Sequence, residues 1–172
     1  TQLNIYRTIL SKEAQYLKDG KTHDIVILGY YGYRNSGDDA ILKFFIDHLQ
    51  ANHKSLSTVV MSNDPSETRS LYRVQSIHRF NIFQIPALLA GTRVFIAGGG
   101  TLIQDDTSSR SLWYYLYMLH LAVKKGAHVV LLANGLGPLT KKKNRKAASK
   151  ILNRLDAITL RDPNAFEELK SL

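Results

Sequence analysis

Six short apolar runs alternate with amphipathic stretches along most of the chain. The runs are rich in β-branched residues and are bounded by glycine or polar residues, which favours strands over segments of buried helix. The predicted strands cover residues 25–28, 59–61, 74–77, 94–97, 129–133 and 157–160. Helical patterns cover residues 39–52, 65–72, 81–89, 109–125, 142–154 and 163–172.

This alternation predicts βαβ crossovers, and therefore a mostly parallel sheet with helices on both faces. The expected fold class is a doubly wound, Rossmann-like α/β domain of about six strands. Helix boundary signals agree with it. Ser36 and Asp38 are cap-type residues before the first helical pattern, Gly126 follows the fourth, and Asp162 with Pro163 opens the last.

The chain length predicts one folded domain, because 172 residues can bury one sizeable core. We assign residues 24–172 to this domain and residues 1–23 to an N-terminal helical extension, which lacks the apolar core of a signal peptide. No apolar stretch reaches the ~20 residues that span a bilayer. The sequence contains no cysteine, which fits a reducing compartment. We therefore expect a cytoplasmic protein.

The chain carries a net charge of +9, which favours anionic partners. Lysines gather at positions 141–143, 146 and 150, over the fifth predicted helix. One interpretation is a solvated helix face. The other is attraction to anions such as phosphorylated substrates or the inner face of an anionic membrane, since lysines at a helix start oppose its dipole unless an anion is near. We expect no nucleic-acid partner, and the sequence predicts no oligomeric state.

Two glycine-bearing loops follow the first and fourth predicted strands. The first reads GYYGYRNSGDD over residues 29–39, and the second begins with Gly98, Gly99 and Gly100 and leads to Asp105, Asp106 and Arg110. A strand, a glycine loop and a helix start together can hold an anion. The dinucleotide and P-loop fingerprints are absent. Tyrosine, asparagine and aspartate side chains in the first loop suit a sugar or another polyhydroxylated ligand instead.

Two further loops should reach the same edge of the sheet, because ligands bind beyond the carboxyl ends of parallel strands. One contains Asn134 and Gly135, whose glycine could also serve only the turn. The other contains Arg161, whose planar guanidinium suits a carboxylate or phosphate. The structural alternative for Arg161 is pairing with Asp162 or Asp156. The histidines form no ligand-spaced pair. A hard cation needs several converging oxygen ligands, and adjacent aspartates on one loop rarely converge, so we expect no metal.

Four motifs in the chain resemble the polysaccharide pyruvyl transferase family. They read GYYGYRNSGDDAIL, GGGTLIQDDTSSRSLWYY, NGLGPL and ITLRD, and their order and spacing match the family from Asp24 onward. Asn134 departs from the family pattern, where glutamine is usual. The resemblance implies two Rossmann-like domains similar to those of GT-B glycosyltransferases. This chain corresponds to the N-terminal domain, and the C-terminal domain has no counterpart in the sequence.

The resemblance also implies the reaction. A pyruvyl group would pass from phosphoenolpyruvate, the donor substrate, to two hydroxyls of a sugar in a cell-wall or exopolysaccharide precursor, often lipid-linked. No cofactor is implied. The general acid is expected outside this chain. Two alternatives stay open: a GT-B-type glycosyltransferase domain that uses a nucleotide sugar, and a non-catalytic glycan-binding module.

Motif positions then assign roles to individual residues. Arg161 is expected to contact phosphoenolpyruvate, and together with Asp38 and Asp105 it forms the expected catalytic set. The expected substrate-binding residues are Tyr31, Gly32, Asn35, Gly98, Gly99, Gly100, Arg110, Asn134 and Gly135.

Overall fold

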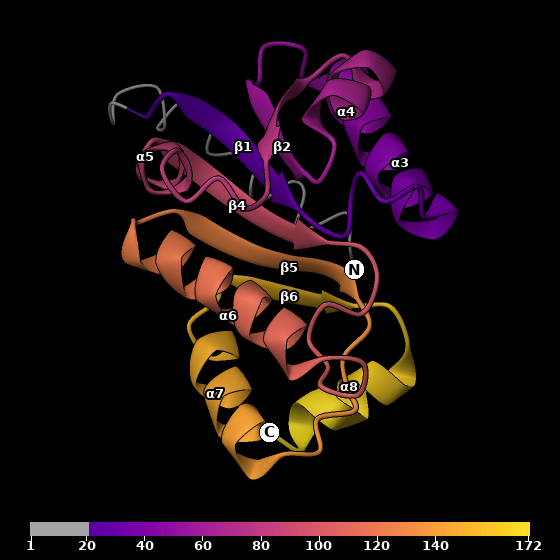
Figure 1. The fold of residues 1–172 in the computed structure, drawn as a ribbon, viewed down its shortest axis with the longest axis vertical. Coiled ribbons are helices and arrows are strands. Elements are labelled where there is room, and N and C mark those ends of the chain that lie inside the picture. The colour runs from indigo at the N-terminus through magenta and orange to yellow at the C-terminus, as the bar shows by residue number, and fades with distance from the viewer. Residues whose placement is uncertain (1–20) are drawn as a thin grey trace.

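A six-stranded, all-parallel sheet with helices on both faces forms the described part of the chain, residues 21–172, in this computed structural model (Figure 1). The strand order is β3-β2-β1-β4-β5-β6, which is the order of a doubly wound Rossmann-like sheet. The strands are β1 (His23–Leu28), β2 (Thr58–Ser62), β3 (Gln75–His78), β4 (Thr92–Gly98), β5 (His128–Asn134) and β6 (Ala157–Leu160). The predicted fold class is confirmed. Residues 1–20 of the predicted N-terminal extension lie outside the described residues, and His23, at its predicted end, begins β1.

Each predicted helix of the domain is also present. The helices are α3 (Ser36–Asn52), α4 (Pro65–Tyr72), α5 (Ile85–Ala90), α6 (Ser109–Lys124), α7 (Lys142–Leu152) and α8 (Pro163–Lys170). None of these described helices has the length and apolar character needed to cross a membrane. Asp162 caps α8 as predicted, because its side chain accepts a hydrogen bond of 2.9 Å from the Ala165 N–H.

Two helix starts differ from the prediction. Helix α3 begins earlier, because the Asn35 side chain is its cap and accepts from the Gly37 and Asp38 N–H groups, in place of the predicted Ser36 or Asp38. Helix α5 begins later, at Ile85, after a turn in which the Asn81 side chain accepts from the Gln84 N–H. A side-chain cap thus sets the start of α3, whereas the start of α5 follows a turn at Asn81 and has no side-chain cap.

Alternating side chains of each strand serve two separate apolar layers. Val26 and Leu28 of β1 point to the layer built with α5, α6 and α7, whereas Ile25 and Ile27 point to the layer built with α3. Strands that are buried on both faces read as continuous apolar runs, which is why the six runs were recognisable in the sequence.

The sheet topology places the two glycine loops side by side. Strands β1 and β4 are hydrogen-bonded neighbours at the centre of the sheet, with Leu28 opposite Ala97 at their carboxyl ends. From β1 the chain runs outward through β2 to β3, and from β4 it runs outward through β5 to β6. The loops that leave β1 and β4 therefore diverge at the point where open α/β sheets bind ligands.

Candidate functional site

A buried tyrosine ties the two glycine loops together. The Tyr31 hydroxyl donates a hydrogen bond of 2.8 Å to the Gly98 carbonyl, and only 1% of the residue is exposed. Burial raises the pKa of this hydroxyl above its ordinary value. Gly32 packs elsewhere, against the loop after β2, where its carbonyl accepts from the Asn63 side-chain amide at 3.4 Å. The structure therefore uses Tyr31 and Gly32 to hold the first loop in place.

Asp38 faces the second glycine loop from the first turn of α3. Its residue is 6% exposed, and its Oδ1 would lie 2.9 Å from a Cβ placed on Gly100 and 3.2 Å from one placed on Gly99. Both glycines have positive φ, +80° at Gly99 and +59° at Gly100. Side chains at positions 99 and 100 are thus excluded by the backbone conformation there and by the approach of Asp38.

Arg161 approaches the same place from the end of β6. Its Nη2 lies 3.4 Å from the Thr101 hydroxyl, and a Cβ on Gly135 would lie 2.8 Å from that nitrogen. The alternative pairing with Asp162 also exists, at 3.4 Å between Nε and Oδ2, with 54% and 36% of the two side chains exposed. An exposed, long ion pair of this kind is weak, so the guanidinium keeps donors for another anion.

Asp38 and Arg161 influence each other electrostatically. Burial, followed by the charge of Asp39, raises the pKa of the Asp38 carboxyl, and the charge of Arg161 acts in the opposite direction. The structure thus brings together Asp38, Gly99, Gly100, Gly135 and Arg161 from the ends of four strands. Asn35 and Arg110 are exposed at the starts of α3 and α6.

Asp105 occupies a separate position, at the N-terminus of α7. Its buried carboxylate accepts hydrogen bonds from the Thr140 N–H and hydroxyl, the Lys141 N–H and the Asn144 side-chain amide, at 2.7–3.1 Å. Burial alone would raise the pKa of Asp105, but these hydrogen bonds outweigh burial and hold the pKa at about 2. This carboxylate is therefore the anion near the lysines at the start of α7, and its charge offsets their unfavourable interaction with the helix dipole.

Asn134 is likewise engaged inside the protein. The residue has 0% exposure, and its amide donates to the Ala97 and Leu132 carbonyls, both at 3.0 Å. Its Oδ1 accepts from the Leu102 N–H at 3.4 Å. The side chain therefore connects the ends of β4 and β5 rather than reaching the surface of the site.

Arg79 supports the first glycine loop, and the sequence did not predict this role. It follows β3, is 3% exposed, and donates to the Gly29 carbonyl and the Tyr115 hydroxyl, both at 3.0 Å. Its guanidinium carbon lies within 5.6 Å of the ring centroids of Tyr33, Phe80, Tyr114 and Tyr115. No ion pair of Arg79 occurs among residues 21–172, and its buried Nε lacks a hydrogen-bond partner there. Its position just after a strand was the only signal available.

The gathered groups can bind an anion and move a proton. Arg161 offers charged donors beside the Thr101 hydroxyl, and Asp38 offers a carboxylate with a raised pKa, which suits proton transfer. Within the described part of the chain, no three histidine or acidic residues are grouped in a way that could hold a metal ion.

Comparison with known families agrees with the motifs. The model of the family described as polysaccharide pyruvyl transferase matches residues 35–172, which is more than half of the chain. The match includes three of the four strand-end loops and begins inside the first, at Asn35. No curated protein and no solved structure matches the chain. The chain therefore belongs to the polysaccharide pyruvyl transferase family.

Proposed function

We propose that this site transfers a pyruvyl group from phosphoenolpyruvate to two hydroxyls of a glycan acceptor, a precursor of a cell-wall or extracellular polysaccharide. Family membership supports pyruvyl transfer in general. The observation that carries the proposal is the approach of Asp38 and Arg161 to one glycine-lined space at the carboxyl ends of β1, β4 and β6. A cation for the donor and a carboxylate for the acceptor are thereby close together.

Arg161 is proposed to bind the donor. Phosphoenolpyruvate carries a carboxylate and a phosphate, and the guanidinium fork can donate two parallel hydrogen bonds to either group. The Thr101 hydroxyl, 3.4 Å from Nη2, is placed to assist. The absence of a side chain at Gly135 supports this role, because a Cβ there would lie 2.8 Å from the same nitrogen.

Asp38 is proposed to act on the acceptor. After protonation of the methylene carbon of phosphoenolpyruvate, the adjacent carbon is electron-poor and a sugar hydroxyl attacks it. Asp38 would take the proton of that hydroxyl, a role that the raised pKa of a buried carboxylate suits. Inorganic phosphate then leaves with the electrons of its C–O bond. A second sugar hydroxyl attacks the same carbon and gives its proton to the departing phosphate, which completes the ketal. No residue of this chain is proposed as the acid that protonates carbon.

The remaining predicted residues are of two kinds: exposed residues at the edge of the candidate site and buried residues that hold its loops in place. Asn35 and Arg110, both exposed, are proposed to line the acceptor side of the rim. Tyr31, Asp105 and Asn134 are proposed as positioning residues, because their polar atoms are engaged within the protein.

Ligand-induced stabilisation tests the donor. Phosphoenolpyruvate at ~100 times its Kd should raise the stability of the native chain by ~2.7 kcal/mol, seen as a higher melting temperature. A UDP-sugar should produce no shift. Stabilisation by the UDP-sugar alone would favour the glycosyltransferase alternative, and glycan binding with no response to either donor would favour the binding-module alternative.

Arg79 supplies a second test of the site. Replacing Arg79 with methionine should change the unfolding free energy by less than ~1 kcal/mol. The variant loses two hydrogen bonds and the contacts of the guanidinium with four aromatic rings, but it also removes a buried charge that has no ion pair among residues 21–172. Phosphoenolpyruvate should bind ~10-fold more weakly, because the first glycine loop loses its donor to the Gly29 carbonyl. Denaturant unfolding and calorimetric titration measure the two effects.

Arg69→Met is the matched control, because the exposed Arg69 donates to the Ser76 carbonyl at 2.9 Å, away from the glycine loops. This variant should bind phosphoenolpyruvate as the native chain does. A large loss of stability in Arg79→Met with unchanged donor affinity would show that Arg79 serves the fold and not the site.

A further inference from the structure

Charge is segregated along this chain. Between Glu67 and Asp156 the only acidic residues are Asp105 and Asp106. Helices α5, α6 and α7 all fall within this segment, and the Asp105 carboxylate is buried in hydrogen bonds at the start of α7. The exposed lysines of α6, of α7 and of the residue before α7 are Lys124, Lys141, Lys142, Lys143, Lys146 and Lys150. The exposed surface of α5, α6 and α7 is therefore cationic, whereas α8, which packs on the same core, carries Glu167 and Glu168 at its edge.

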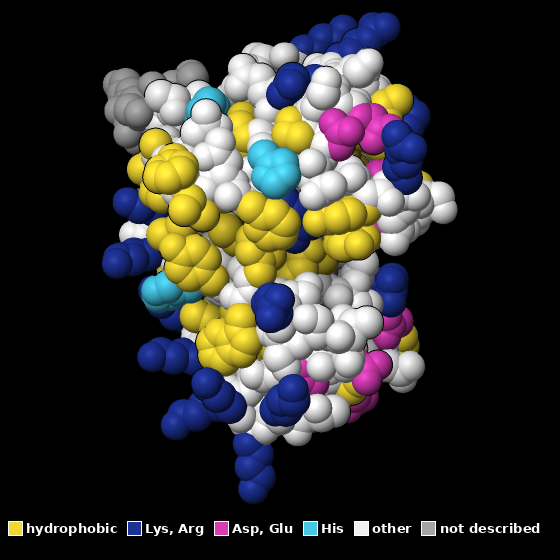
Figure 2. Space-filling view, in the orientation of Figure 1, with side chains coloured by type: hydrophobic (Ala, Val, Ile, Leu, Met, Phe, Trp, Pro, Cys, Tyr) yellow, Lys and Arg dark blue, Asp and Glu magenta, His cyan; other side chains and the backbone are white. Residues whose placement is uncertain are grey.

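Large apolar side chains are exposed on the same layer. Ile82 and Phe83, in the turn before α5, are 70% and 88% exposed, and Trp113 and Tyr117, one turn apart on α6, are 41% and 59% exposed. Figure 2 shows hydrophobic side chains gathered across the middle of this face, with lysines and arginines along its left and lower edges. A gathered apolar surface of this kind marks an interaction site.

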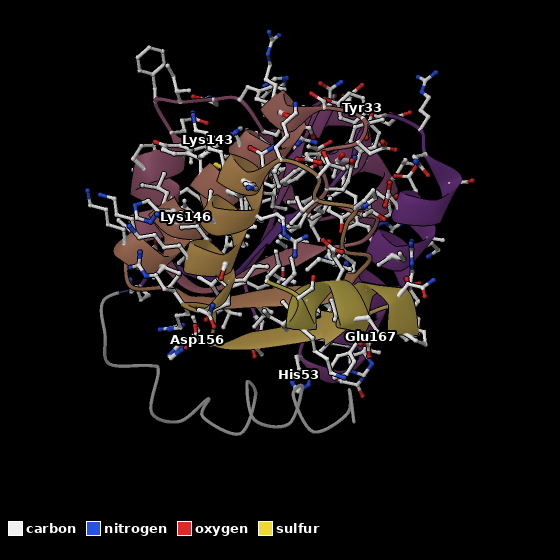
Figure 3. The ribbon with its side chains drawn as sticks, turned by 90° about the horizontal axis from the view of Figure 1, so that it is seen from below. Tyr33, His53, Lys143, Lys146, Asp156 and Glu167 are labelled. Atoms are coloured by element: carbon white, nitrogen blue, oxygen red, sulfur yellow. The ribbon has the colours of Figure 1, made fainter. Side chains whose placement is uncertain are left out.

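The exposed apolar side chains of α6 and the lysines of α7 are in contact. The Lys143 ammonium lies 5.4 Å from the centroid of the Trp113 ring. Figure 3 shows Lys143 and Lys146 on α7, which packs against α6. We name Ile82, Phe83, Trp113, Tyr117, Lys143 and Lys146 the aromatic–lysine face. Exposed aromatic and aliphatic residues beside lysines are typical of surfaces that lie in the interface of a membrane.

We propose that the aromatic–lysine face docks on an anionic membrane surface. Its lysines complement anionic headgroups, and each contributes ~1 kcal/mol near such a surface. Ile82 and Phe83 can enter the boundary between headgroups and acyl chains, where their exposure in water is relieved. A second copy of the same face is a poorer partner, because a two-fold contact would place lysines of both copies against each other.

Docking in this way would bring the candidate site to the membrane. Phe80, in the same connection as Ile82 and Phe83, packs edge-on against Tyr114 with ring centroids 5.0 Å apart. The guanidinium of Arg79 lies 5.2 Å from the Phe80 ring and donates to Gly29 of the first glycine loop. The turn before α5 and the glycine loop therefore belong to one continuous cluster.

Trp113 allows docking to be observed directly, because it is the only tryptophan in the chain. The full chain is mixed with vesicles of phosphatidylcholine alone or of phosphatidylcholine and phosphatidylglycerol in equal parts. We expect a blue shift of tryptophan emission and co-sedimentation with the anionic vesicles only, both reversed by high salt. No donor or acceptor is present, so the outcome is independent of the proposed pyruvyl transfer.

Exposed substitutions then locate the contact. Ile82→Ser with Phe83→Ser should weaken partitioning into anionic vesicles by ~10-fold or more, and Lys146→Glu should weaken it by ~10-fold. The matched controls lie on the opposite side of the sheet. They are Phe44→Ser with Leu71→Ser, at positions 71% and 66% exposed, and Lys54→Glu after α3. The controls should partition as the native chain does, and all variants should keep its melting temperature.

Several results would overturn the proposal. Among them are no binding to anionic vesicles, equal binding to neutral vesicles, and equal weakening by the control variants. Tighter binding of a mixed-sequence nucleic-acid duplex, lost in the same face variants, would assign the face to nucleic acid instead. A stable dimer that is broken by Ile82→Ser with Phe83→Ser would assign it to a second copy.

Discussion

Replacing Arg161 with alanine is expected to weaken the binding of phosphoenolpyruvate by ~100-fold, because the donor loses charge-assisted hydrogen bonds worth ~3 kcal/mol. Arg161 is half exposed, and the one ion pair that it makes among residues 21–172, with Asp162, is long. Its removal should therefore leave the fold intact. Isothermal calorimetry measures the affinity, and circular dichroism on heating confirms that the variant is folded.

Two further variants sharpen this result. Arg161→Lys keeps the charge but loses the planar fork, so donor affinity should recover only in part. Arg154→Ala is the matched control, because Arg154 is exposed before β6, at the end of the strand opposite Arg161, and contacts the His120 ring at 3.2 Å. Equal affinity in Arg161→Ala and the native chain would remove Arg161 from the donor site.

Replacing Asp105 with alanine is expected to lower the free energy of unfolding by ~3 kcal/mol and the melting temperature by roughly 10 °C. The substitution leaves the donors of Thr140, Lys141 and Asn144 without their acceptor and removes the anion at the start of α7. Denaturant titration at neutral pH measures the change. Asp106→Ala is the matched control, because Asp106 is exposed and its loss should cost less than ~0.5 kcal/mol.

The effect of Asp105 should depend on pH in a defined direction. The pKa of this carboxyl is held at about 2 in the folded protein, below its ordinary value of 3.8. A lowered pKa stabilises the folded state above pH 3.8, and this contribution is lost as the pH falls toward 2. The difference between Asp105→Ala and the native chain should therefore shrink in acid. A constant difference across that range would mean that packing, not the charge, carries the effect.

Local pattern was sufficient for the elements but not for all of their boundaries. Apolar runs such as residues 25–28 were recognisable because strands buried on both faces contain few polar positions. The start of α3 was misplaced because several cap-type residues occur in succession, and only the geometry of the turn selects Asn35. The start of α5 was misplaced because the turn at Asn81 resembles a helical pattern in sequence.

Sequence patterns likewise identified some residues of the candidate site but not the long-range contacts of others. Asp38 and Arg161 were identifiable because each follows a predicted strand, and parallel strands present their carboxyl ends at one edge of the sheet. The contacts of Asp105 with α7 were not, because its partner Asn144 is 39 residues away in the chain. Arg79 was missed for the same reason, since its partner Gly29 is 50 residues away.

The sequence by itself determined the doubly wound fold, the family and the loops that form the candidate site, because these depend on local periodicity and on short motifs. Tertiary structure alone decided which polar groups face the site and which are engaged inside the protein. Asp38 and Arg161 lie beside the glycines of the strand-end loops. Asn134 and Asp105 are buried and hydrogen-bonded, and the Arg79 guanidinium lies among aromatic rings. The physical reason is that burial and hydrogen bonding of a polar group depend on partners distant in sequence, whose approach only chain packing sets.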